Sequence, residues 1–235
     1  MEKELDLQNK LRPGLDILAN EIIISLKKRI RYKQNLPIYE SGLVKDHPEL
    51  SLLEYELARV EELHAELGRY MYSDQESFTN VSGVPLIILR NAPPSPIYNI
   101  PTEMGKKTIE FYIQWIKQAC PEGTDSDRFG ETVTTDVANL LNLLERITLG
   151  KFVAESKFQE ETEAFKNTGG EYGAIENLIR HPERENDVLR MAAQLARHYE
   201  FSEKEAIYMF QWLIDATVDV QVRYIQNRLN LGKNK

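Results

Sequence analysis

Two cationic side chains, Arg146 and Lys157, lie eleven residues apart in a segment that otherwise has the pattern of a helix packed in a core. At about 100° per residue they return to one helix face, about 16 Å apart along the axis. Gly150 and Val153 lie between them on that face, so nothing in this stripe neutralises either charge. Because an unpaired buried charge is costly, the pattern predicts an anionic ligand that spans both cations and closes over the groove left by Gly150. The alternative is that two long side chains reach solvent from the edge of a helical bundle.

Polar residues also interrupt the apolar stripes of the last two predicted helices. Thr217 and Gln221 lie one turn apart on the stripe of the last helix, and a glutamine has both a donor and an acceptor to satisfy. Glu185 leads the stripe of the preceding helix with Arg184 beside it, and the helix dipole alone explains a carboxylate in a first turn. Together with the two cations, these positions predict a polar cavity inside a bundle, lined by Arg146, Lys157, Glu185, Thr217 and Gln221.

Helical periodicity dominates the chain and predicts an all-α fold, a bundle of long helices. The proline-rich segment 73–104 is incompatible with regular helix and is expected to be a long strap across the surface. No convincing set of strands is present. Helices are expected at about 11–26, 53–67, 105–119, 131–166, 183–199 and 202–230, with a short turn near 173–180.

A weak internal repeat relates the two halves of the chain. The pattern from Leu11 to Arg29 (Leu-Arg-x-x-Leu-Asp, two apolar turns, Arg) is echoed from Asp136 to Arg146, and another long helix follows each copy after a connector. We therefore expect one domain over 1–235 built from a duplicated helical unit. Residues 1–104 would hold the degenerate N-terminal repeat and the strap, and 105–235 the C-terminal repeat with most of the site.

Composition excludes several classes of function. The chain has 235 residues and a net charge of −8, with basic residues spread along it, which argues against nucleic acid or a membrane as the main partner. The single cysteine, Cys120, rules out an intramolecular disulfide and fits a reducing compartment. Neither a signal segment nor a bilayer-spanning apolar run is present, so we expect a cytoplasmic protein. The four histidines include no close helical pair, and no metal site is expected.

These residues resemble the all-helical chorismate mutase family, in its long eukaryotic-type form with two copies of the ancestral helical unit. The sixteen residues 144–159, Leu-Glu-Arg-Ile-Thr-Leu-Gly-Lys-Phe-Val-Ala-Glu-Ser-Lys-Phe-Gln, are similar to the family's signature helix. Further matches are Gly68-Arg69-Tyr70 with 74–78, Phe129-Gly130, and Thr217-x-x-x-Gln221. The resemblance covers nearly the whole chain, although 79–127 matches only in outline, and it implies a homodimer.

The resemblance implies the pericyclic rearrangement of chorismate to prephenate in phenylalanine and tyrosine biosynthesis, without a cofactor. In that reading Arg146 binds one substrate carboxylate and Arg12 the other. Lys157 and Gln221 donate to the ether oxygen from opposite sides, and Glu185 accepts from the substrate hydroxyl. The wall of the site is assigned to Thr217, Arg184 and His181, the last at a position where relatives commonly carry an amide or acid.

Several departures from the family pattern have consequences. The residue eleven after Arg29 is Glu40, and the residue seventeen before Arg146 is Phe129, so only one complete set of cations exists and one active site per chain is expected. Pro13 disfavours helical geometry at Arg12. Long-form enzymes often carry glutamate at the position of Gln221, whereas a neutral amide donates at any ordinary pH. We therefore expect activity at neutral pH without an acidic optimum.

Long-form relatives are often regulated by aromatic amino acids at a dimer-interface site, which Arg69, Gly130 and Thr134 match. Gly68 and Glu131 do not match the regulated fungal-type pattern, and the Glu131 carboxylate would repel an effector carboxylate. Strong inhibition by tyrosine is therefore not expected.

Two other functions remain open at this point. The same bundle and cation pair could serve an isochorismate or aminochorismate mutase, or a pyruvate lyase. A non-catalytic helical interaction protein would keep the fold without the chemistry, but it would be expected to lose the polar set, and every core member of that set is present.

Overall fold

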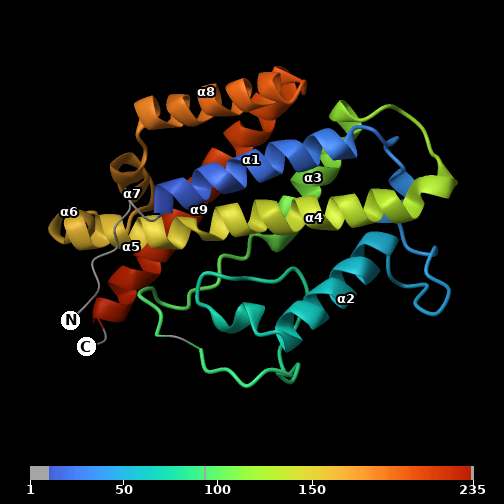
Figure 1. Cartoon of the computed structure of the whole chain (residues 1–235). Helices are drawn as coiled ribbons and strands as arrows, with labels where there is room; N and C mark the ends of the chain where they lie inside the picture. Colours follow the sequence, from blue (N-terminus) through green and yellow to red (C-terminus); the bar gives the residue numbers. More distant parts are fainter. Residues whose placement is uncertain (1–10, 93, 234–235) are drawn as a thin grey trace.

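A computed structural model describes residues 11–92 and 94–233, and within them it is helical with no β-strand, which confirms the all-α class (Figure 1). None of the described helices is both long enough and apolar enough to cross a bilayer. The helices are α1 (Arg12–Arg29), α2 (Leu52–Glu66), α3 (Gly105–Ala119), α4 (Phe129–Thr148), α5 (Gly150–Glu160), α6 (Thr162–Asn167), α7 (Tyr172–Ile179), α8 (Pro182–His198) and α9 (Glu203–Lys233).

The helix predicted over 131–166 was wrong in its continuity, because the structure divides it into α4, α5 and α6. At Leu149 the backbone stays helical but tightens, and the Phe152 amide donates to the Leu149 carbonyl three residues earlier at 3.1 Å. Glu161 has φ −127° and ψ 38°, which ends α5. Figure 1 shows α5 continuing the line of α4, so the interval from Arg146 to Lys157 still follows nearly one axis.

A fully buried ion pair joins the C-terminal end of α1 to the N-terminal half of α4. Arg29 Nε donates to Asp136 Oδ1 at 2.5 Å, and both side chains have no exposed surface. The Tyr39 and Tyr112 hydroxyls donate to the same carboxylate at 2.7 and 2.8 Å, and the Arg29 guanidinium also donates to the Gln34 carbonyl at 2.9 Å. Because both ions are surrounded by hydrogen-bond partners, the pair fixes the antiparallel alignment of α1 and α4.

The strap 73–104 contains no helix or strand in its described residues, as predicted, but buried acceptors fasten it. The Glu61 carboxylate of α2 accepts from the Phe78 and Thr79 amides at 2.8 and 2.7 Å. At the strap's far end the Thr102 amide donates to Glu76 at 2.8 Å, and Glu76 forms an ion pair of 2.5 Å with the buried Lys151 of α5. The strap therefore links α2 to the helix that carries Lys157.

Helix α9 crosses the α4–α5 line obliquely and packs against it (Figure 1). The Phe210 ring faces Arg146, and the Tyr224 hydroxyl donates to Glu155 at 2.7 Å. Between these contacts a methyl group at Gly150 would lie 2.9 Å from Thr217 Cγ2 and 3.4 Å from the Thr217 carbonyl. The predicted open groove at Gly150 was therefore wrong, because α9 fills the space that the glycine leaves.

We predict that Gly150→Ala lowers the free energy of unfolding by about 1–3 kcal/mol, because the added methyl group overpacks the contact between α5 and α9. Denaturant titration followed by circular dichroism measures this. The matched control is Gly130→Ala in α4, where an added methyl group meets nothing within 4 Å, and no loss of stability is expected. Equal stability of the two variants would contradict this account of the packing.

Candidate active site

Arg146 lies half-buried near the end of α4 and has no carboxylate partner within ion-pair distance among the described residues. Its Nη1 donates to the backbone carbonyl of Leu15 in the first turn of α1 at 2.9 Å, and its guanidinium lies 5.4 Å from the Phe210 ring centroid. Burial lowers the pKa of Arg146 to about 10, against the opposing charge of Asp16. The guanidinium stays charged at neutral pH and keeps unused donors.

Lys157 lies half-buried in α5 and, like Arg146, binds a backbone carbonyl. Its Nζ donates to the backbone carbonyl of Ile179 at 2.6 Å, and in the described part of the chain it forms no ion pair. Burial, followed by the charge of Arg184, lowers the pKa of Lys157 to about 8, although nearby glutamates oppose the shift. The structure thus confirms that neither cation of the predicted stripe is neutralised by an adjoining carboxylate.

Gln221 lies one turn after Thr217, which contacts Gly150, and three residues before Tyr224, which donates to Glu155, so it falls within the stretch of α9 that packs on α5. Its side chain is 6% exposed, and its Oε1 has no hydrogen-bond partner in the described structure. Thr217 is different, because its hydroxyl donates to the Leu213 carbonyl at 2.7 Å. A buried amide with an unused acceptor is costly, so this position is suited to a polar ligand.

The remaining predicted residues gather where α7 meets α8. Glu185 accepts from Arg180 Nη1 at 3.2 Å. His181 is exposed, and its pKa is lowered by partial burial and by the charges of Lys157 and Arg184. Arg184 is exposed and forms no ion pair with a described residue. This junction therefore brings the predicted acceptor and wall residues to the Lys157 end of the stripe.

Arg12 is the first residue of α1 and is exposed. Pro13 follows it in the first helical turn, where a missing amide hydrogen costs nothing, so the expectation that Pro13 disfavours helical geometry at Arg12 was wrong. One turn later lies Leu15, whose carbonyl accepts from Arg146. The helix turn that carries Arg12 is therefore adjacent to the Arg146 end of the stripe.

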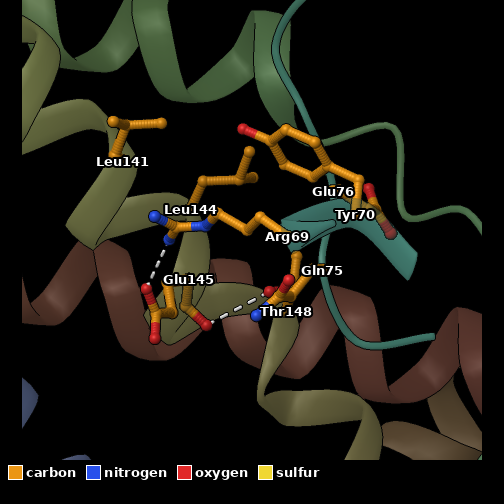
Figure 2. A pocket seen from close by; sticks show the side chains of 8 residues that line it. All are labelled: Arg69, Tyr70, Gln75, Glu76, Leu141, Leu144, Glu145 and Thr148. Carbon is orange, nitrogen blue, oxygen red and sulfur yellow. Dashed lines mark hydrogen bonds and ion pairs between the residues drawn. The ribbon is translucent and has the colours of Figure 1, made fainter. Parts of the chain in front are cut away.

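The three predicted effector residues are not brought together within one chain. Arg69 Nη2 pairs with Glu145 Oε2 at 2.7 Å, in a small pocket between the segment after α2 and the end of α4 (Figure 2). Gly130 and Thr134 lie at the other end of α4. The fifteen residues from Gly130 to Glu145 correspond to about 22 Å along the helix. Gly68 has φ +81°, and a Cβ there would lie 2.9 Å from Met71 Sδ, which explains the glycine at this departure from the regulated pattern.

Sequence reasoning missed Arg180 and both backbone carbonyls. Arg180 forms ion pairs with Glu176, Glu185 and Asp215. Its signal in the sequence was a cation two residues before the proline that begins a predicted helix, with carboxylates four residues earlier and five residues later. The Leu15 and Ile179 carbonyls had no signal, since backbone acceptors become specific only when helices pack.

Comparison with known proteins points to one family. Residues 133–222 match the family model described as chorismate mutase type II. The chorismate mutase of Emericella nidulans is 31% identical over 97% of this chain and 94% of its own length, and that of Schizosaccharomyces pombe is 28% identical over 85% and 81%.

Solved structures agree in fold. A chorismate mutase from Candida albicans in complex with L-Trp superposes with a TM-score of 0.89 at 23% identity, covering 96% of this chain and 92% of that one. The plant enzyme AtCM1 with tyrosine in an allosteric site gives a TM-score of 0.83 at 25% identity, covering 97% and 99%. Because the chain is 31% identical to the Emericella enzyme over nearly the full length of both, it belongs to the chorismate mutase family.

Proposed function

We propose that this protein rearranges chorismate to prephenate, in the biosynthesis of phenylalanine and tyrosine. The observation that carries the proposal is a pair of half-buried cations, Arg146 and Lys157, that bind backbone carbonyls in place of carboxylates. The buried Gln221, whose Oε1 has no partner among the described residues, would present its amide NH2 group to the ligand after a half-turn of the amide. Chorismate is a dianion with two carboxylates, an ether oxygen and a hydroxyl. Its groups match two cations, a neutral donor and an acceptor.

The reaction is pericyclic, so neither a nucleophile nor a proton transfer is required. The protein has to hold the compact conformer and to direct donors at the ether oxygen, which gains negative charge as the C–O bond breaks. We assign carboxylate binding to Arg146 and Arg12, donation to the ether oxygen to Lys157 and Gln221, and acceptance from the hydroxyl to Glu185. Thr217 supports the wall through its methyl group at Gly150. Arg184 and His181 complete the wall at the α7–α8 junction.

The two backbone carbonyls keep the site ready for a dianion. A carboxylate forms shorter and stronger hydrogen bonds to a cation than a neutral carbonyl does, so substrate would displace the Leu15 and Ile179 carbonyls at little cost. Bound anions would also reverse the effect of burial on Arg146 and Lys157 by favouring their charged forms. Part of the binding energy would therefore come from giving Arg146 and Lys157 the anionic partners that they lack in the free protein.

We propose one active site per chain. Arg29, the counterpart of Arg146 in the repeat, is neutralised by Asp136 and is not available to a ligand. Residues 1–104 would then be the degenerate repeat that contributes Arg12, and 105–235 the repeat that supplies the rest of the site. A cytoplasmic location is supported by the single cysteine, Cys120, which is buried.

Loss of chorismate absorbance at neutral pH, with prephenate identified as product, tests the activity. We predict that Lys157→Ala lowers kcat/KM by about 100–1000-fold, because a donor to the developing oxyanion is lost. Lys166→Ala is the control, since this lysine pairs with Glu163 on the surface and should leave the rate unchanged.

Other products would contradict the proposal. Release of pyruvate would indicate a lyase, and turnover of isochorismate or aminochorismate alone would indicate a related mutase. No turnover of any of these substrates would leave a helical interaction protein.

The pH dependence of kcat/KM separates the roles of Gln221 and Lys157. We predict a level profile from about pH 5 to 7, because an amide donates throughout, and a fall above pH 8 as Lys157, with its pKa of about 8, loses its proton. Gln221→Glu should retain activity near about pH 5 and lose it toward about pH 8 as the new acid ionises. A steep loss in the unsubstituted enzyme between about pH 5 and 7 would argue against this role for Gln221.

We propose a homodimer whose interface includes an exposed apolar surface formed by the end of α2 and the strap. The Ile87 amide donates to the Glu66 carbonyl at 3.0 Å, which holds this part of the strap against α2. The surface comprises Leu63, Leu67, Leu86, Ile87 and Leu89, all exposed. A two-fold axis across α4 would bring Arg69 toward the partner's end of α4, where Gly130 and Thr134 lie.

Light scattering is expected to give twice the chain mass of 27.2 kDa. Leu89→Asp should shift the population toward monomer, whereas Leu43→Asp, at an exposed leucine outside this surface, should not. Added L-tyrosine should change kcat/KM by less than about threefold, since Arg69 already forms an ion pair with Glu145 and is less available to an effector carboxylate. A monomeric parent, or inhibition by tyrosine well beyond that range, would contradict the corresponding half of the proposal.

A further inference from the structure

Arg180 lies between α7 and α8 and contacts three carboxylates at once. Its Nε donates to Glu176 of α7 at 2.9 Å, its Nη1 to Glu185 of α8 at 3.2 Å and its Nη2 to Asp215 of α9 at 2.8 Å. The side chain is 32% exposed. Because the guanidinium is planar, one side chain fixes the relative positions of three carboxylates from three helices.

The same junction also holds Lys157. The carbonyl that accepts from Lys157 belongs to Ile179, the residue directly before Arg180. Arg180 is the ion-pair partner of Glu185 in the described structure, and Lys157, Arg184 and His181 are the other basic groups nearby. Without Arg180, the Glu185 carboxylate would be free to turn toward the cation that has to meet the substrate.

We infer that Arg180 is a positioning residue, which holds one oxygen of Glu185 and thereby keeps the carboxylate aimed at the substrate hydroxyl and away from Lys157. The inference rests on the proposed function. Arg180 also offsets the negative charge of Glu176, Glu185 and Asp215, which would otherwise oppose the approach of a dianion.

A double-mutant cycle on kcat/KM for chorismate tests the inference. Arg180→Met is expected to lower kcat/KM by about 10–100-fold in the parent and by less than about threefold in the Glu185→Gln background, because its effect passes through Glu185. Arg180→Lys should restore part of the loss, since an ammonium can still bind one carboxylate. Equal losses in both backgrounds would overturn the inference.

Two controls separate positioning from support of the fold. Glu176→Gln and Asp215→Asn each remove one of the other Arg180 contacts and should keep kcat/KM within about threefold of the parent. A loss in either control as large as that of Arg180→Met would show that Arg180 acts only by supporting the fold. Circular dichroism and denaturant titration on every variant establish that each one folds.

The pH profile supplies a readout that a purely structural role would not move. The charged and titratable groups around Lys157 are Arg184, His181, Glu160, Glu161 and Glu185. In Arg180→Met the released Glu185 carboxylate should pair with Lys157 and move the alkaline fall of kcat/KM to higher pH, by about one unit. An unmoved alkaline limb would overturn the inference.

Failure of the inference and failure of the proposed function remain distinguishable. If the parent converts chorismate while Glu185→Gln matches the parent, the positioning role is overturned and the mutase stands. If the parent does not convert chorismate at all, the proposed function is overturned together with this inference.

Discussion

A buried arginine is stable in a protein interior when a carboxylate and other acceptors surround it, and Arg29 meets that condition against Asp136. This pair joins the end of α1 to the first half of α4 and sets their antiparallel alignment. In consequence the first turn of α1 lies at the opposite end of α4, where the Leu15 carbonyl accepts from Arg146. The Arg29–Asp136 pair therefore also places the Leu15 carbonyl where Arg146 can bind it.

The two half-buried cations of the candidate site lower local stability because they have no ion-pair partner among the described residues. Paired charges around them offset this cost. Burial lowers the pKa of Arg146 to about 10 and of Lys157 to about 8, which means that the charged forms are disfavoured in the free protein. Neighbouring buried charges are instead fully paired. Lys151, next to Gly150, pairs with Glu76 of the strap, and Glu155 accepts from Tyr224. Among the described residues next to the site, Lys151 and Glu155 are therefore paired, whereas Arg146 and Lys157 have no ion-pair partner.

Local pattern was sufficient for part of this structure, and tertiary packing decided the rest. Period and proline content predicted most of the helices and the strap, and polar residues on apolar stripes marked Arg146, Lys157 and Gln221 as candidate site residues. The turn predicted near 173–180 was wrong, because the structure has helix α7 there. The groove at Gly150 could not be judged without α9, because only packing shows that Thr217 fills it. The break at Leu149 adjoins Gly150, but a single glycine inside a helical pattern is commonly tolerated, and the break at Glu161 has no glycine or proline beside it. Arg180 became meaningful only when three helices met around it.

The measurement that tests the central claim most directly is a crystal structure with a rigid bicyclic dicarboxylate that mimics the compact conformer of chorismate. The account predicts one ligand per chain, with Arg146 released from the Leu15 carbonyl and Lys157 from the Ile179 carbonyl so that both bind ligand oxygens. It also predicts that the Arg29–Asp136 pair stays unchanged. A ligand bound elsewhere, with both cations still on their backbone carbonyls, would contradict the account.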